Sequence, residues 1–301
     1  MAWRNLIVQN ALEVTCKDNQ LVSSGLEGVH SVPLEDINSV LFENKTTRVS
    51  VAVLVQLAAH NVTVYFCDDK HLPAAVLLPY AQHSSHVGVV RMQEAVSLPT
   101  QKRLWQQIVI AKINNQGRCL EMLDLIEAAS HLYALAKTVT SGDSTNVEAT
   151  AAAYYFPALF GKDFVRDNDG DPVNAALNYG YAILRGHIAR TLVSYGLLPI
   201  RGLHHHNAHN SFNLADDLIE AFRPVVDLYV ATSEFAETGL TSDLKHRLVN
   251  ILNLDIGSGG QMHSVAFAVE RLVQSLTRCY ADADKKLLLP VLMTLRQHRY
   301  E

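Results

Sequence analysis

The stretch that decides the fold is LWQQIVIAKINNQGRCLEMLDLIEAASHLYALAK, residues 104–137. Apolar residues recur in it at helical spacing, as at Leu104, Ile108 and Ala111, and few helix-breaking residues interrupt it. Such a pattern predicts long helices. Further tracts of this kind predict helices over residues 146–160, 172–195, 214–222, 241–252, 262–280 and 285–300. The chain beyond about residue 90 is therefore predicted to be all-α.

The sequence before this stretch has a β-type pattern instead. Short β-prone runs bounded by turn signals predict strands over residues 5–9, 13–17, 20–23, 29–32, 39–42, 62–67 and 74–78. One helix is predicted among them, over residues 48–60, because Val51, Leu54, Val55 and Ala58 share a helical face. The predicted fold class is α+β: a small N-terminal β domain with one helix (residues 1–80), a linker (residues 81–90) and a larger C-terminal all-α domain (residues 91–301).

Composition limits the class of protein. The chain has 301 residues, of which 49% are hydrophobic and 18% charged, so it can bury a substantial core. No run approaches 18 consecutive apolar residues, and the first ten residues lack the pattern of a secretory signal. The four cysteines are widely spaced, as expected in a reducing compartment. We therefore expect a cytoplasmic protein that does not bind a membrane.

The charge balance argues against a generally polybasic nucleic-acid binder. The formal net charge is -5, with 25 lysines and arginines against 30 aspartates and glutamates. Residues 81–140 are the one net-basic part, with 6 basic and 4 acidic side chains. Any contact with nucleic acid must therefore depend on local patches.

The densest chemical signal is GLHHHNAH (residues 202–209), followed by NLADDLIE (residues 213–220). Asn213 is expected to cap a helix that begins at Leu214, and Asp217 and Glu220 then share one face of that helix. A histidine loop that leads into clustered carboxylates can form a mixed nitrogen and oxygen site for Mn²⁺ or Mg²⁺. The alternative is that the histidines are solvated and the acids stabilise the helix start. In either case at most one or two of the adjacent histidines can reach one ion.

A second carboxylate of interest is Glu148, which begins a helix whose next residues are small. Its side chain can either serve a site or stabilise the helix dipole. The sequence contains no GxxxxGK[ST], GxGxxG or GxSxG motif, so P-loop nucleotide hydrolysis and serine-esterase chemistry lack support.

Taken in chain order, several motifs resemble the CRISPR adaptation integrase family, whose members insert new spacers into CRISPR arrays. They are Glu148 in its small-residue helix, DPVNAALNYGY (residues 171–181), GLHH (residues 202–205) and DLIEAFRP (residues 217–224). The opening Trp3-Arg4 and FCDDKHLP (residues 66–73) resemble the type II branch in particular. The similarity runs from residue 3 to about residue 227.

This resemblance implies a metal-dependent DNA integrase and endonuclease. A prespacer 3′-OH would attack repeat phosphodiesters, and the catalytic metal ligands for Mg²⁺ or Mn²⁺ would be Glu148, His205 and Glu220. The Gly-x-x-His register selects His205 among the clustered histidines. Asp217, one turn before Glu220, is a further possible ligand.

The resemblance also implies partners. These are double-stranded DNA as prespacer and CRISPR repeat, a second copy of the chain, a small ferredoxin-like protein that completes a heterohexamer, and the type II effector nuclease. The N-terminal domain would serve dimerisation and partner contact, in a prokaryotic cytoplasm. Candidate DNA contacts are the basic residues Arg91, Lys102, Arg103, Lys112, Arg118 and Arg223. Two alternatives remain open: a metal-dependent branched-DNA nuclease in repair, and a non-catalytic DNA-binding scaffold homologue.

Overall fold

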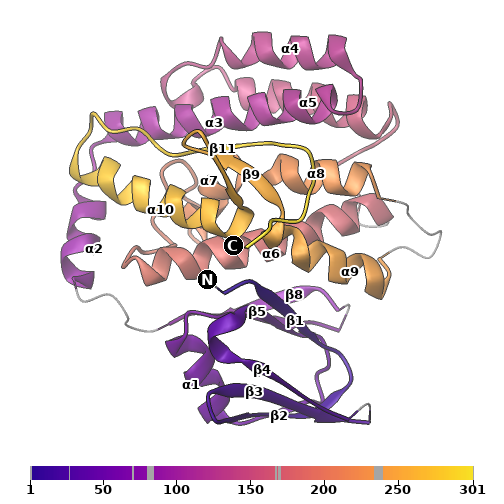
Figure 1. Ribbon diagram of the computed structural model, residues 1–301. Coiled ribbons are helices and arrows are strands. Elements are labelled where there is room, and N and C mark those ends of the chain that lie inside the picture. The colour runs from indigo at the N-terminus through magenta and orange to yellow at the C-terminus, as the bar shows by residue number, and fades with distance from the viewer. Residues whose placement is uncertain are drawn as a thin grey trace. The chain divides into compact units, whose positions relative to one another are not determined.

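The computed structural model describes residues 2–26, 28–69, 71–79, 85–166, 168, 171–233 and 240–300. The chain divides into two compact units, residues 1–84 with 299–301, and residues 85–298. The first is rich in strands and the second in helices (Figure 1), which confirms the mixed α+β class.

The first unit contains two four-stranded sheets. One has the order β1-β5-β7-β8, in which β1, β5 and β7 are parallel and β8 is antiparallel. The other has the order β4-β3-β2-β6. The strands are β1 (Arg4–Val8), β2 (Ala11–Lys17), β3 (Gln20–Gly25), β4 (Gly28–Pro33), β5 (Ile37–Phe42), β6 (Arg48–Val49), β7 (Thr63–Cys67) and β8 (Pro73–Leu77).

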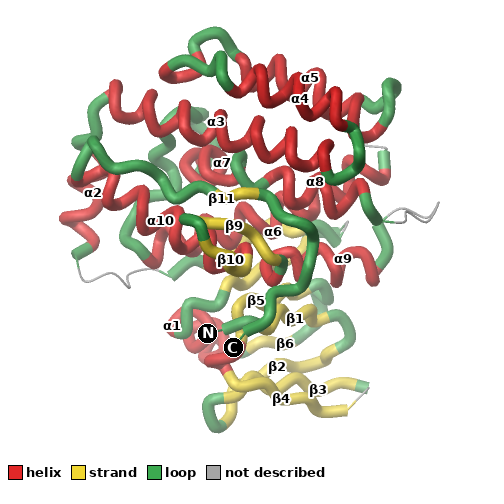
Figure 2. Tube along the Cα trace, turned by 45° about the horizontal axis from the view of Figure 1, so that its top comes forward, coloured by secondary structure: helices red, strands yellow, loops and turns green. Residues whose placement is uncertain are grey.

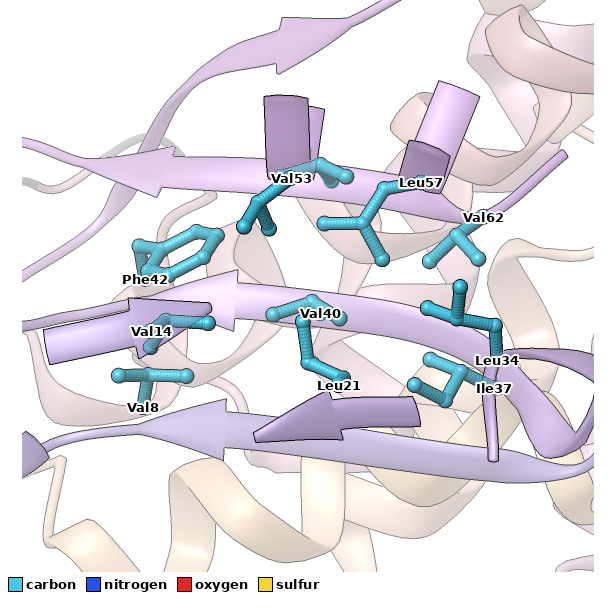
Figure 3. Close-up of a cluster of buried hydrophobic side chains, with 11 residues drawn as sticks. Val8, Val14, Leu21, Leu34, Ile37, Val40, Phe42, Val53, Leu57 and Val62 are labelled. Carbon is cyan, nitrogen blue, oxygen red and sulfur yellow. The ribbon is translucent and has the colours of Figure 1, made fainter. Parts of the chain in front are cut away.

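The core of this unit lies between the sheets and helix α1 (Val51–Ala59), as Figure 3 shows. Val40 of the fully buried strand β5 lies among Val14 and Leu21 from the second sheet and Val53 and Leu57 from α1. The Ser50 hydroxyl accepts a hydrogen bond from the backbone N–H of Val53 and so caps α1. The predicted β-rich region with one helix is thereby confirmed.

The second unit is built mainly of helices. They are α2 (His86–Glu94), α3 (Leu98–Glu121), α4 (Ile126–Ala136), α5 (Val147–Phe160), α6 (Pro172–Ser194), α7 (Asn213–Ile219), α8 (Arg223–Ala231), α9 (Ser242–Val249) and α10 (Val265–Ala281). The tract expected to run without interruption to residue 137 divides into α3 and α4, because the chain reverses at Asp124, whose φ is 60°. The two helices pack closely, since a Cβ on Gly117 would lie only 2.6 Å from the Tyr133 ring.

The expectation of an all-α C-terminal domain is wrong. Strands β9 (Asp255–Ser258), β10 (Gln261–Ser264) and β11 (Pro290–Val291) form a small antiparallel sheet of order β10-β9-β11. Gly259 and Gly260, both with positive φ, make the turn between β9 and β10. The helix expected over residues 262–280 therefore begins only at Val265, where the Ser264 hydroxyl caps it.

The helix expected over residues 285–300 is absent. Beyond α10 the chain is extended and carries β11 (Figure 2). Asn115 of α3 holds this segment: its amide donates to the Pro290 carbonyl at 3.0 Å and its oxygen accepts from the Leu292 N–H at 2.9 Å. A long-range contact thus outweighs the local helical pattern.

The unit boundaries also differ from the predicted ones. Of the predicted linker, residues 81–84 lie outside the described residues and residues 86–90 are the first part of α2. Tyr300 belongs to the first unit, where its ring lies 6.2 Å from that of Trp3. Helix α8 was not predicted; Pro224 occupies its first turn, where proline starts a helix. No helix in the described part of the chain has the length and apolar character needed to cross a membrane.

Candidate functional site

Four charged side chains of the helical unit meet at one place, which we call the acid corner: Lys112, Glu148, Glu220 and Arg223. Lys112 comes from α3, Glu148 from the first turn of α5, and Glu220 and Arg223 from the junction of α7 and α8. The Lys112 ammonium lies 2.6 Å from Glu148 Oε1 and 2.5 Å from Glu220 Oε2. Two carboxylates that are far apart in sequence therefore share one buried cation.

Glu220 has a second cation partner. Arg223 Nε lies 2.8 Å from Glu220 Oε1, so each oxygen of this carboxylate faces a positive charge. Burial raises the pKa of Glu220, but Arg223 and Lys112 outweigh it and hold that pKa at about 2. Burial also lowers the pKa of Lys112, and the Glu220 and Glu148 carboxylates more than reverse this and raise it. Glu220, Lys112 and Arg223 are therefore charged at neutral pH.

Glu148 does not cap its own helix. The Asp143 carboxylate does so, accepting hydrogen bonds from the backbone N–H groups of Val147 at 2.9 Å and Glu148 at 3.0 Å. The Glu148 side chain instead reaches Lys112. The side chain therefore lies at the acid corner, while Glu148 also remains in the first turn of α5, where its charge favours the helix dipole.

The second part of the site is the histidine loop, residues 202–209, which lies in the segment between α6 and α7. Asp217 on α7 is fully buried and holds this loop with both carboxylate oxygens. Its Oδ2 accepts from the N–H groups of Leu203 at 2.5 Å and His204 at 3.1 Å. Its Oδ1 accepts from the His205 N–H at 3.1 Å and contacts His205 Nδ1 at 2.7 Å. Asp217 thus fixes both the loop backbone and the His205 ring.

The neighbouring residues distinguish His205 from the other clustered histidines. His204 stacks on Trp105 at 4.4 Å, whereas His205 meets the edge of the same ring at 5.7 Å. His204, His206 and His209 are exposed. The hydrogen bond to Asp217 is the main cause of a raised pKa at His205, with Glu220 contributing through its charge.

Gly202 and Asn213 fix the course of this loop. A Cβ on Gly202 would lie 2.2 Å from the His205 carbonyl oxygen and 2.9 Å from Asp217 Oδ2, so no larger residue fits. The expected capping role of Asn213 is wrong, because α7 already includes Asn213 and follows Phe212. The Asn213 amide donates instead to the carbonyls of Ile200 and Asn207 and so ties the loop to α7.

A cavity of about 510 Å³ adjoins the acid corner. The residues that line it include Lys112, Glu220 and Arg223 of the acid corner, together with Arg166, Tyr181 and Arg185. Arg166 donates to Asn174 and Asn178, and Arg185 pairs with Asp216. The sequence analysis missed Arg166 and Arg185. The asparagines at 174 and 178, one helical turn apart in the motif at residues 171–181, were the signal that could have found Arg166.

A buried carboxyl group also lines this cavity. Asp227 on α8 accepts hydrogen bonds from the hydroxyls of Tyr155 and Tyr181. Burial raises the pKa of Asp227 to about 6, because these bonds only partly offset the loss of solvent. Arg223 lies over the Tyr181 ring at 4.4 Å, which connects this group to the acid corner.

The predicted DNA-contacting residues fall into two groups that differ in location. Arg91, Lys102 and Arg118 are exposed on α2 and α3, and Arg103 is half-buried. Lys112 and Arg223 lie instead within the acid corner. Among the residues that the structure describes, no group of three or more histidine, cysteine, aspartate or glutamate side chains is arranged to hold a metal ion.

The fold and site together define an α+β protein with an acid and histidine site in its helical unit. Residues 6–234 match the sequence model of the family described as CRISPR associated protein Cas1. The chain belongs to this family, as the motifs predicted, and hence to the proteins of CRISPR adaptation.

Two relatives show how far the similarity extends. The chain is 41% identical over 307 residues to the CRISPR-associated endonuclease Cas1 of Neisseria meningitidis serogroup C (strain 8013), covering all of both chains. It is 30% identical over 219 residues to a CRISPR-associated endonuclease Cas1 of Pyrobaculum aerophilum, covering 67% of this chain and 72% of that protein.

Solved structures share the fold at lower sequence identity. A casposase bound to integration product has a TM-score of 0.78 and 20% identity, with 94% of this chain and 92% of that chain covered. A Cas1 protein from Thermotoga maritima has a TM-score of 0.73 and 15% identity, with 96% and 100% covered. A chain of a Cas6-RT-Cas1–Cas2 complex has a TM-score of 0.70 and 20% identity, with 97% of this chain but 36% of that chain covered.

Proposed function

We propose that this chain is a divalent-metal-dependent DNA integrase and endonuclease that inserts new spacers into a CRISPR array. The observation that carries the proposal is the meeting of Glu148 and Glu220 at a single cation. The family to which the chain belongs and its full-length likeness to a named endonuclease support this activity. The fold shared with a casposase bound to integration product is consistent with strand transfer.

The acid corner fits a hard divalent cation. One oxygen from each of Glu148 and Glu220 lies within 2.6 Å of a common point, now taken by the Lys112 nitrogen. Mg²⁺ and Mn²⁺ prefer such oxygen ligands, together with a limited number of imidazoles. Glu148, Glu220 and His205 would hold the ion after a rearrangement, because in the described part of the chain these side chains are not arranged as a group of three ligands. When bound, it would polarise the phosphate and lower the pKa of the attacking hydroxyl.

Asp217 is assigned to positioning rather than to the metal. Its two oxygens already take hydrogen bonds from three backbone N–H groups and contact His205 Nδ1. Because Nδ1 is engaged, Nε2 is the His205 nitrogen that remains for a metal. A carboxylate behind a ligating histidine also fixes its ring orientation and raises its basicity.

The basic residues of the cavity are suited to hold the DNA. Arg166 and Arg185 are oriented by neighbouring asparagine or aspartate side chains, so their guanidinium groups need little reorganisation to meet a phosphodiester. Arg223 would neutralise charge beside Glu220 as a 3′-OH attacks the phosphate in line. Exposed Arg91, Lys102 and Arg118 would contact the duplex further away.

The proposed assembly is a homodimer that acts with a small ferredoxin-like partner on prespacer and repeat DNA, and with the type II effector nuclease, in the prokaryotic cytoplasm. The fold shared with a chain of a Cas6-RT-Cas1–Cas2 complex is consistent with an assembly that contains a further Cas protein. A partner that pairs two dimers would set the distance between two integration sites.

An integration assay on a supercoiled array plasmid tests the proposed function. The wild-type chain with its partner and Mg²⁺ or Mn²⁺ should join a prespacer to the array, and chelation of the metal should stop the reaction. His205→Ala should also stop it, while His209→Ala, in the same loop but exposed, should retain it. Integration that persists in His205→Ala or without divalent metal contradicts the proposal.

A further inference from the structure

The Lys112 side chain occupies the point where the two carboxylates of the acid corner meet. Its side chain is 10% exposed, and Glu148 and Glu220 are 21% and 7% exposed at their side chains. Two mostly buried carboxylates that each have an oxygen within 2.6 Å of one point would repel each other without a cation at that point. Lys112 therefore maintains a spacing that the carboxylates would not keep by themselves.

We propose that Lys112 is a built-in counter-cation that holds Glu148 and Glu220 at metal-binding distance and must leave before a divalent ion can bind between them. This inference rests on the proposed metal-dependent function. Lys112 is in this role a positioning residue. It makes the metal-free chain more stable, and it lowers the affinity for metal because the ion must displace the ammonium group.

The charges and the available space support an exchange of this kind. Glu148 and Glu220 together carry two negative charges, which Lys112 and Arg223 balance. A divalent ion added beside both cations would leave an excess of positive charge in a nearly buried site, so one cation has to withdraw. Both line the 510 Å³ cavity, but Arg223 is held over the Tyr181 ring at 4.4 Å, whereas Lys112 has a flexible four-carbon stem that can turn its ammonium into the cavity.

Calorimetry of Mn²⁺ binding to the full chain, without DNA, tests the proposal. Lys112→Met should bind Mn²⁺ about tenfold more tightly than wild type, because no charge competes for the carboxylates. Lys112→Arg, which keeps a cation, should remain near wild type. Lys137→Met removes an exposed lysine from the end of α4 and should change nothing.

The variants also separate this inference from the proposed function. Glu148→Gln should abolish Mn²⁺ binding if the metal site is assigned correctly. If it does, and Lys112→Met binds Mn²⁺ with unchanged or lower affinity, the role of Lys112 is wrong and the metal site stands. If neither the wild type nor Lys112→Met binds Mn²⁺, both are wrong.

A measurement on the wild-type chain does not depend on how the variants fold. Amine-reactive labelling followed by mass spectrometry should find Lys112 protected without metal and labelled several-fold faster in saturating Mg²⁺. Lys137 should be labelled at the same rate in both conditions. Equal or slower labelling of Lys112 in Mg²⁺ would contradict the proposal.

Discussion

The acid corner and the histidine loop lie in the same unit but are held in place by different kinds of interaction. In the acid corner, long side chains from three elements form ion pairs, and Lys112 contacts two carboxylates. In the histidine loop, backbone N–H groups converge on the fully buried Asp217. Side-chain ion pairs can exchange one cation for another, whereas backbone hydrogen bonds fix a geometry. One part of the site is therefore exchangeable and the other is preorganised.

We expect Glu148→Gln, in the acid corner, to lose activity without losing the fold. The amide keeps the shape of the side chain but removes a charge that the metal requires, so integration should fall by about 10³-fold or to background. Thermal melting should change little, since this side chain is partly exposed. Glu127→Gln, on the exposed face of α4, is the control. Unchanged integration in Glu148→Gln would remove the acid corner from the site.

A substitution at Asp217, which holds the histidine loop, should have the opposite effect: it should chiefly lower the stability of the fold. Asp217→Asn places an amide against donors that now meet a carboxylate, and should lower the free energy of unfolding by about 3 kcal/mol or more. Urea unfolding measures this loss. Asp243→Asn, which breaks only an exposed ion pair with Arg247, should cost less than about 1 kcal/mol. Equal small losses in both variants would show that Asp217 does not hold the loop.

Asp227 differs from both regions, because burial is the largest influence on its pKa. Its pKa is raised from 3.8 to about 6, so the folded state binds the proton more tightly and this group's contribution to stability is lost as pH rises from about 4 through 6. Asp227→Asn has no carboxyl group to titrate at this position, so it does not lose this stability as pH rises. Relative to wild type, the variant should therefore gain up to about 3 kcal/mol between pH 4 and pH 7 in urea unfolding. A difference that stays constant over this range would contradict the raised pKa.

Gly202→Ala should have a smaller effect, confined to the histidine loop. The added methyl group collides with the His205 carbonyl oxygen, so the loop has to shift at a cost of about 2 kcal/mol, and integration should fall with it. Gly88→Ala, in α2, meets no atom within 4 Å and is the control; it should be neutral or slightly stabilising. A Gly202→Ala chain that melts and integrates like wild type would show that the loop is not fixed.

Local patterns predict much of this fold, and they fail where distant residues decide. Strands such as β5 and long helices such as α3 and α6 follow from periodicity. The extended chain after α10 does not, because the side chain of Asn115 from a distant helix binds it. In the small C-terminal sheet, β11 pairs with a strand about 30 residues earlier in sequence, whereas the β9–β10 hairpin has a local signal in Gly259 and Gly260 that the sequence-based prediction overlooked.

The candidate site divides in a similar way. Motif order predicts Glu148, His205 and Glu220 as site residues, and Gly202 fits its place for a steric reason. Sequence alone places Lys112 on a basic helix, and its interpretation as a DNA contact follows from that. Its position between two acids depends on how α3, α5 and α7 pack, which no local spacing encodes. The same holds for Arg166 and Arg185 in the cavity.

A crystal structure of the chain soaked in Mn²⁺, with the ion located by its anomalous scattering, tests the proposed site most directly. We expect one peak within about 2.5 Å of a carboxylate oxygen of both Glu148 and Glu220 and of His205 Nε2, with the Lys112 ammonium turned away. A peak at Asp217, or a chain saturated with Mn²⁺ in which Lys112 still bridges Glu148 and Glu220, would contradict this expectation.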